Sequence, residues 1–145
     1  MMVEAVAPAA PIQVLRGLRE RGFRFTVETR TEIHEHKVGA HPVTYADGLT
    51  ISGPEPLTDE DRAALLADKP IFLAAACVMR PPVPWLRVLV DRYRTGYEIE
   101  VRRSGWKGPY RIRLAMVAAN VAAFIGLHPA HDGPRLEPII EEVLR

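Results

Sequence analysis

The segment from Gly48 to Ala76, GLTISGPEPLTDEDRAALLADKPIFLAA, most constrains how this chain can fold. It contains an alternating strand, a Gly-Pro turn, a capped helix start and a proline break. Thr58 is a typical N-cap, and three acidic residues follow it where the positive end of a helix favours negative charge. Pro70 disfavours a helical residue before it and suits the first turn of a new helix. The segment therefore predicts a strand, a helix that ends near Asp68, and a second helix from Ile71 to Met79.

The residues before this segment predict a helix followed by the first strand of a β-hairpin. Apolar residues recur at a spacing of three from Ile12 to Arg21, and Gly22 supplies the stop of this helix. Apolar and polar residues then alternate from Phe23 to Val27, the period-two pattern of a strand with one buried face. The alternation continues weakly through Thr31, Ile33 and Glu35, so the first strand either ends soon after Val27 or runs on to about Lys37. Glycine, proline and an Asp-Gly turn then interrupt residues 38–48. We therefore expect a hairpin whose second strand is Leu49–Ile51, with a long connection between the strands.

The second half of the chain predicts another unit made of a helix, a hairpin and further helices. A proline-rich linker at residues 80–84 separates it from the first half. Its patterns predict one helix, two strands and two helices in chain order: Trp85–Tyr93, Tyr97–Val101, Tyr110–Leu114, Ala115–Ile125 and Pro134–Leu144. The predicted fold class is therefore α+β. We expect residues 1–11 to be a flexible tail, and the units at residues 12–79 and 85–145 either pack as one domain or stand apart.

Seven residues of the first half align without gaps on seven residues of the second half at an offset of 74. The pairs are Ile12/Leu86, Val14/Val88, Leu15/Leu89, Gly22/Gly96, Phe23/Tyr97, Phe25/Ile99 and Val27/Val101. Two interpretations fit this similarity. Either the chain is a diverged repeat of one helix–hairpin–helix unit, or the similarity arises by chance. The second is plausible because a glycine commonly separates an amphipathic helix from an amphipathic strand. A single pair of copies is weak support for a repeat.

Length and cysteine content limit the class of protein. A chain of 145 residues fits one compact domain or two very small ones. The single cysteine, Cys77, excludes an internal disulfide framework and suits a reducing cytoplasm. The longest nearly uncharged run, Leu114–Leu127, has 14 residues, and a helix that spans a bilayer needs about 20. The N-terminus lacks the pattern of a signal peptide, so we expect a cytoplasmic protein that does not enter a membrane.

No stretch of the sequence has the pattern of a catalytic site. The two serines, Ser52 and Ser104, lie beside glycines at expected strand ends and outside any nucleophile-elbow pattern. Cys77 lies in an apolar run that predicts a buried, inert thiol. No glycine-rich loop leads into a helix, as a loop that cradles phosphate does. We therefore expect a protein that is not an enzyme and that needs no cofactor.

Histidines in the expected long connection are weak candidates for a metal site. In a strand, His34 and His36 would point the same way as Glu32, and His41 is close by in the sequence. Zinc needs three or four converging ligands, however, and this set has no cysteine. Solvated histidines are the commoner outcome in a polar loop, so we expect no metal.

The order of elements from residue 12 to residue 79 is that of a known family. The residues that carry the resemblance are Leu15, Leu18, Gly22, Phe23, Phe25, Val27, Leu49, Ile51, Gly53, Pro54, Leu57, Thr58, Leu65, Leu66, Lys69, Pro70 and Ile71. This pattern resembles the TubC-type N-terminal docking domain, which is found at the N-termini of nonribosomal peptide synthetase subunits. Similar segments occur in proteins of phage and mobile elements, including some attached to primases.

The resemblance implies a small α/β unit that dimerises and whose exposed hairpin binds the tail of a partner subunit by strand addition. For this chain it implies a non-enzymatic protein–protein docking or adaptor module that forms a homo-oligomer. The partner-binding residues would lie on the hairpin: Arg24, Phe25, Val27, Leu49 and Ile51.

A basic and aromatic segment from Arg92 to Arg113 supports a second hypothesis, a small nucleic-acid-binding accessory protein of a mobile-element or primase-associated type. It has seven cations and four aromatic residues, and the predicted second hairpin would present them to a phosphate backbone and to stacked bases. The expected contacts are Arg102, Arg103, Trp106, Lys107, Arg111 and Arg113. The other interpretation of this segment is a solvated strand face over a core of tyrosine and aliphatic side chains.

Overall fold

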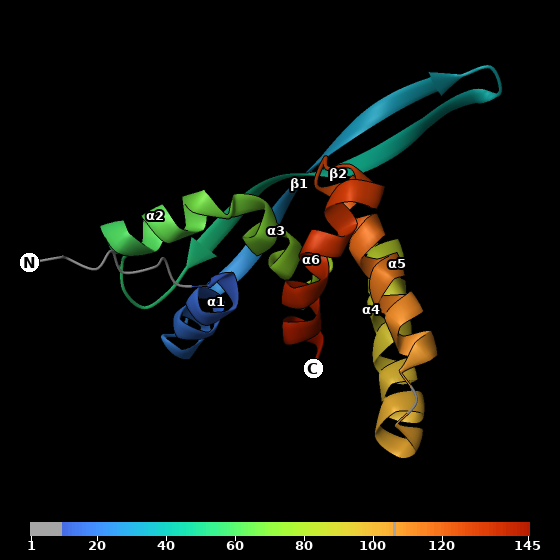
Figure 1. Ribbon diagram of the computed structural model, residues 1–145. Coiled ribbons are helices and arrows are strands. Elements are labelled where there is room, and N and C mark those ends of the chain that lie inside the picture. Colours follow the sequence, from blue (N-terminus) through green and yellow to red (C-terminus); the bar gives the residue numbers. More distant parts are fainter. Residues whose placement is uncertain (1–9, 106) are drawn as a thin grey trace, which may run out of the picture.

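The computed structural model describes residues 10–105 and 107–145 (Figure 1). Its elements, in chain order, are α1 (Pro11–Glu20), β1 (Arg24–His36), β2 (Gly39–Ser52), α2 (Asp59–Ala67), α3 (Lys69–Met79), α4 (Pro84–Gly96), η1 (Tyr97–Arg102), α5 (Gly108–Phe124) and α6 (Pro129–Leu144). η1 is a π-helical continuation of α4. The two strands form one antiparallel sheet beside the helices, which confirms the predicted α+β class.

The first helix and the strand after it are as the sequence predicts. α1 ends before Gly22, which adopts a φ of 87°, a left-handed conformation that costs glycine little. Phe23, Phe25 and Val27 then point into the core and are only 5%, 3% and 9% exposed. The alternating pattern therefore identified the buried face of β1.

The prediction of a long connection between the two strands is wrong, because β2 begins at Gly39 and only a short turn joins it to β1. β1 pairs with β2 as far as His36, which leaves a turn of residues 37–38 alone. The Asp-Gly pair belongs to a β-bulge in which Asp47 is the extra residue. Pro42 also lies within the ladder, which an edge strand tolerates when the missing N–H faces away from its neighbour. Pro42 and the Asp-Gly pair, which suggested a loop, are instead irregularities within one long hairpin.

The two helices after the hairpin are confirmed. Thr58 and Asp61 form a capping box, in which the Asp61 N–H donates to the Thr58 hydroxyl over 3.1 Å and the Thr58 N–H donates to the Asp61 carboxylate over 3.0 Å. The helical conformation is interrupted at Asp68, between α2 and α3, and Pro70 lies in the first turn of α3. Every residue from Phe72 to Val78 is buried, so α3 is a core helix that contacts both strands and the helices around it.

The prediction of a second hairpin at residues 97–113 is wrong, because residues 97–104 and 108–113 are helical. α4 runs through Gly96 into η1, and the helical conformation ends before Gly105, which has a φ of 72°. α5 then begins at Gly108 rather than at Ala115. The expected turn therefore joins two helices instead of two strands.

Residue spacing explains this error. Tyr97, Ile99 and Val101 alternate, but Tyr97 and Val101 are also four residues apart and so share one face of a helix. Ile99, which a strand would have buried, is 53% exposed. Glu98 forms an ion pair with Arg102 at 3.1 Å across one helical turn. The local pattern fits both conformations, and the folded chain adopts the helical one.

Gly96 has a packing role and does not stop a helix. Its backbone is α-helical, with φ −62° and ψ −40°, whereas Gly22 is left-handed. A Cβ atom at position 96 would lie 2.1 Å from an Nη atom of Arg113. The missing side chain lets the Arg113 guanidinium donate to the Glu100 carboxylate over 2.6 and 3.0 Å. The two halves of the chain therefore do not repeat the same elements.

Side chains from both halves contribute to one cluster of buried hydrophobic residues. α3 packs against α6, and α6 packs against α5. α6 begins at Pro129 rather than at Pro134, and it contains both Pro134 and Pro138. Tyr93 is 1% exposed, and its hydroxyl has no hydrogen-bond partner among the described residues. Burial raises the pKa of this hydroxyl well above its usual range.

The apolar run near residue 120 belongs to a core helix, as predicted. It lies largely in α5, which buries Leu114, Val117 and Val121 and packs between α4 and α6. Within the described ranges, no single helix combines the length and the apolar character needed to cross a membrane.

Candidate docking ribbon and neighbouring surfaces

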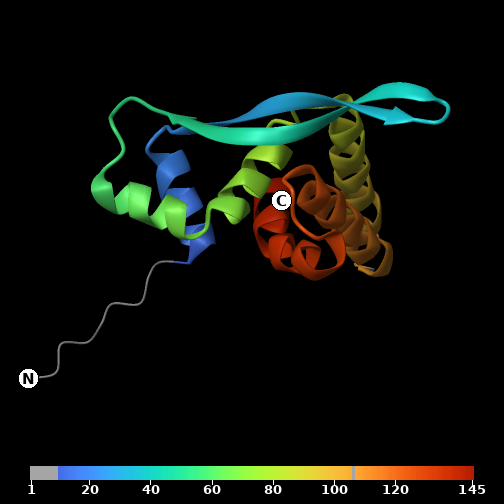
Figure 2. The ribbon, with the colours of Figure 1, turned by 90° about the horizontal axis from the view of Figure 1, so that it is seen from above.

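The outer half of the β-hairpin is an exposed arm. None of residues 28–47, here called the outer ribbon, is buried. Ile33 is 66% exposed and Val38, in the turn, is 98% exposed. Figure 2 shows the hairpin running along one side of the helices, with its closed end extending past α4. The outer ribbon therefore contributes little to the core of the domain.

The two faces of the outer ribbon differ in character. By strand register, one face has small, β-branched and mostly uncharged residues: Thr29, Thr31, Ile33, Glu35, Ala40, Pro42, Thr44 and Ala46. On the other face the Arg30 guanidinium lies over the Tyr45 ring at 5.4 Å and pairs with Glu32 and with Asp47. The outer ribbon has four acidic and two basic residues, a net charge of −2 with histidine neutral. Such an arm lacks the positive charge that binding to a nucleic-acid backbone requires.

The outer edges of the two strands are not equivalent. In a two-stranded sheet each strand keeps one edge without a strand partner. β2 contains Pro42, which cannot donate a backbone hydrogen bond, and the extra residue Asp47 of the bulge. β1 contains neither a proline nor an extra residue. The outer edge of β1 is therefore the more regular template for an added strand.

The predicted partner-binding residues lie at the inner end of the hairpin. Arg24 is exposed, while Leu49 and Ile51 are partly buried against the core. Phe25 and Val27 are core residues, so their side chains are not available to a partner while the domain is folded. Strand addition here would use the backbone of β1, and the accessible part of that strand lies further out.

The predicted nucleic-acid contacts are not assembled on a hairpin. Arg102 is paired with Glu98, and Arg113 is held by Glu100. Arg111 and Arg113 lie on α5, where residues two apart do not share a face. Arg103 and Lys107 are exposed, and Trp106 lies outside the described residues. The hairpin that was expected to present these residues is therefore not formed, and nucleic-acid binding by them stays a prediction.

The histidines of the hairpin do not form a metal site with other ligands. The His36 and His41 rings stack with their centroids 4.5 Å apart, and His34 Nε2 lies 3.2 Å from a Glu32 carboxylate oxygen. In the described part of the chain, no group of three or more His, Cys, Asp or Glu side chains has an arrangement that could hold a metal ion.

Cys77 lies in the centre of α3 and is fully buried, as predicted. Burial raises the pKa of its thiol to about 12, because a thiolate would be desolvated in the core. The group therefore stays protonated at neutral pH and is a poor nucleophile.

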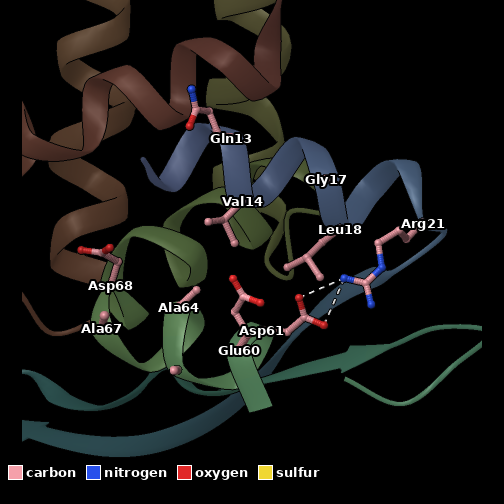
Figure 3. Close-up of a pocket in the computed structure, with 11 residues that line it drawn as sticks. Gln13, Val14, Gly17, Leu18, Arg21, Glu60, Asp61, Ala64, Ala67 and Asp68 are labelled. Atoms are coloured by element: carbon pink, nitrogen blue, oxygen red, sulfur yellow. Dashed lines mark hydrogen bonds and ion pairs between the residues drawn. The ribbon is translucent and has the colours of Figure 1, made fainter. Parts of the chain in front are cut away.

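A groove of about 420 Å³ separates α1 from α2 (Figure 3). It exists because small residues line both helices: Gly17, Ala63, Ala64 and Ala67. Val14 and Leu18 add apolar surface, and Glu60, Asp61 and Asp68 make one wall acidic. The sequence patterns did not indicate this groove, because it depends on how two separate helices pack.

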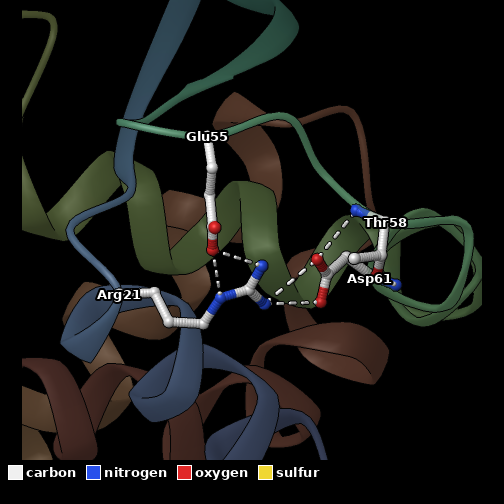
Figure 4. A network of polar contacts seen from close by, with 4 residues as sticks. All are labelled: Arg21, Glu55, Thr58 and Asp61. Carbon is white, nitrogen blue, oxygen red and sulfur yellow. Dashed lines mark hydrogen bonds and ion pairs between the residues drawn. The ribbon is translucent and has the colours of Figure 1, made fainter.

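Arg21 connects three segments at the end of this groove (Figure 4). Its guanidinium donates to the Asp61 carboxylate over 2.9 and 3.0 Å and to Glu55 over 3.1 Å. Asp61 also accepts the Thr58 N–H, so one carboxylate both caps α2 and fastens it to the end of α1.

Replacing Asp61 with asparagine should weaken the acid dependence of stability. The Arg21 guanidinium, together with the Thr58 N–H, lowers the pKa of Asp61 to about 2. A carboxylate whose pKa is lower in the folded state stabilises the fold above its unfolded pKa of about 4, and this stabilisation is lost as the pH falls through the folded value. Urea unfolding at several acidic pH values should therefore show a steeper decline for the wild type than for Asp61→Asn. The control Asp59→Asn, at a fully exposed position of the same helix turn, should decline like the wild type, and an equal decline for Asp61→Asn would contradict the prediction.

No family model, no curated protein and no solved structure matches this chain. The resemblance of residues 12–79 to the TubC-type docking domain therefore stays a prediction.

Proposed function

We propose that this protein is a non-enzymatic docking or adaptor module that binds a partner segment at the edge of its β-hairpin. The observation that carries the proposal is the exposure of the outer ribbon, residues 28–47, none of which is buried. An isolated two-stranded ribbon is at best marginally stable in water, and a third strand would stabilise it. The closed end of this hairpin extends past α4 and has a surface suited to a partner.

Strand addition to the outer edge of β1 is the binding mode that this geometry favours. The backbone of β1 supplies hydrogen bonds without interruption by a proline or a bulge. The side chains on the two faces then supply selectivity. A matching segment would be extended and would carry β-branched or aliphatic residues against Thr31 and Ile33, with basic residues against the net charge of −2.

The partner in this proposal is a protein, either the tail of another chain or the edge of another sheet. Pairing of two such edges from two copies of this chain would give a homodimer. The single cysteine suits a reducing compartment, and we place the protein in the cytoplasm. The resemblance of residues 12–79 to the TubC-type docking domain implies the same mode of binding.

A variant with a shortened hairpin tests whether the outer ribbon is needed for docking while the rest of the domain stays folded. The variant replaces residues 31–44 with Asn-Gly, which favours a two-residue hairpin turn, and so joins the cross-strand neighbours Arg30 and Tyr45. None of the removed residues is buried, so we expect the free energy of unfolding to stay within about 1 kcal/mol of the wild type. We expect self-association in light scattering and co-purification of a partner to be lost. Each co-purified protein is then tested again with purified components.

Two further variants make this test specific. Val38→Ser changes the exposed apolar residue of the turn, leaves the edge of β1 intact, and should bind like the wild type. N–H groups of adjacent strand residues point to opposite edges. In the wild type, one of Thr31 and Glu32 therefore points its N–H toward the outer edge and the other toward β2. Proline at the position with the outward N–H should abolish binding and leave the fold intact. Binding of the same partner by the shortened hairpin would show that the outer ribbon is not the docking element.

A further inference from the structure

A small pocket lies where α1 and α3 end, beside the start of β1 and the last turn of α4 before η1. It has a volume of about 250 Å³. Four arginines from four separate elements line it: Arg19 in the last turn of α1, Arg24 at the start of β1, Arg80 directly after α3 and Arg94 in the last turn of α4. Its apolar wall comes from Phe23, Phe25, Met79 and Val143.

The positive charge of this pocket is not neutralised by the protein. No acidic side chain lines it. Eight of the sixteen arginines in the described chain have an Asp or Glu partner within 4 Å, and the four arginines of the pocket are among the eight that have none. The charge of Arg19 contributes to the lowered pKa of Glu142, but the carboxylate of Glu142 accepts its hydrogen bonds from Arg16, over 2.5 and 2.8 Å. Among the described residues, four arginines therefore line one space that no acidic side chain lines.

A position near the end of a helix explains some of these arginines individually, but it does not explain why the four line one pocket. A cation near the C-terminus of a helix is favourable, because the last carbonyl groups carry partial negative charge. This accounts for Arg19 and Arg80 at the ends of α1 and α3, but not for Arg94, because the helix continues from α4 into η1. It does not account for their convergence on one pocket, or for Arg24, which lies on a strand.

We propose that this pocket binds a phosphate group. The planar guanidinium of arginine matches two oxygens of a phosphate at once, and such charge-assisted pairs are among the stronger hydrogen bonds in proteins. The volume lies below the range of about 300–1,000 Å³ that is typical of drug-sized ligands. The pocket therefore holds the phosphate itself and leaves the rest of a larger ligand outside. This site is separate from the outer ribbon, so it does not depend on the proposed docking function.

The phosphate comes from one of two sources, the terminal phosphate of a small molecule or nucleic-acid end, or the phosphodiester backbone of a nucleic acid. Titration calorimetry with inorganic phosphate at low chloride tests the shared chemistry. Fluorescence anisotropy with a short single-stranded DNA, with and without a 5′-phosphate, separates the sources. Binding that needs the 5′-phosphate indicates a terminal phosphate, and equal binding of both oligonucleotides indicates the backbone.

The decisive comparison is between two double variants of equal charge. Arg80→Ala/Arg94→Ala removes two pocket arginines, and Arg87→Ala/Arg92→Ala removes two exposed arginines outside the pocket. The pocket variant should bind inorganic phosphate about tenfold more weakly or worse, because a hydrogen bond to a charged group contributes on the order of one factor of ten. The control should bind like the wild type, and circular dichroism should show both variants folded. Absence of phosphate binding by the wild type, or an equal loss in both variants, would overturn the proposal.

Discussion

Replacing Phe72 with alanine should lower the free energy of unfolding by about 3–5 kcal/mol, the range observed for large aromatic residues in cores. Phe72 is fully buried on α3, the helix that contacts every other part of the core. The change removes apolar surface from the core and leaves a cavity that neighbouring helices fill only in part. Urea unfolding followed by circular dichroism measures the difference.

The matched control is Leu66→Ala on α2. Leu66 is 73% exposed, and both leucine and alanine favour a helix, so the free energy of unfolding should change by less than about 0.5 kcal/mol. A small effect of Phe72→Ala, comparable to that of the control, would be inconsistent with α3 as the centre of the fold.

Replacing Ile112 with proline should cost about 3 kcal/mol or more. Ile112 lies within α5, where proline removes a backbone hydrogen bond and clashes with the preceding turn. Its side chain is 65% exposed, so the cost would come from the backbone and not from lost packing. Urea unfolding again measures this cost.

Ile112→Lys distinguishes the helix from the hairpin that the sequence predicted. On the exposed face of α5 the lysine should change the free energy of unfolding by less than about 0.5 kcal/mol. In the hairpin Ile112 would face the core, and the lysine would destabilise the fold by several kcal/mol through burial of a charge. A large loss of stability for Ile112→Lys would therefore favour the hairpin.

Several elements were predictable because their signals are local. The Thr58–Asp61 capping box, the left-handed Gly22 and the position of Pro70 involve residues within a few positions of one another. The alternation from Phe23 to Val27 identified the buried face of β1, because successive side chains of a strand point to opposite sides. Burial of Cys77 followed from an uninterrupted apolar run.

Other elements could not be predicted because their local signals are ambiguous or absent. Tyr97 and Val101 fit both a strand face and a helix face, and the choice between them depends on packing against α5. The weak alternation through Glu35 indicated that β1 could reach about Lys37, but the outer part of β2 buries no residue and left no hydrophobic pattern from which its length could be read. Gly96 looked like a helix stop and is instead the point where Arg113 crosses α4.

By itself the sequence determined the α+β class, most of the helix ends and the buried face of β1, because hydrogen bonds and side-chain periods act over a few residues. Only the tertiary structure decided the helical conformation of η1 and of the start of α5, the groove between α1 and α2, and the pocket of four arginines. Arg19, Arg24, Arg80 and Arg94 come from four elements spread over more than half of the chain. Their convergence depends on how the core packs these elements together, and no spacing along the chain encodes it.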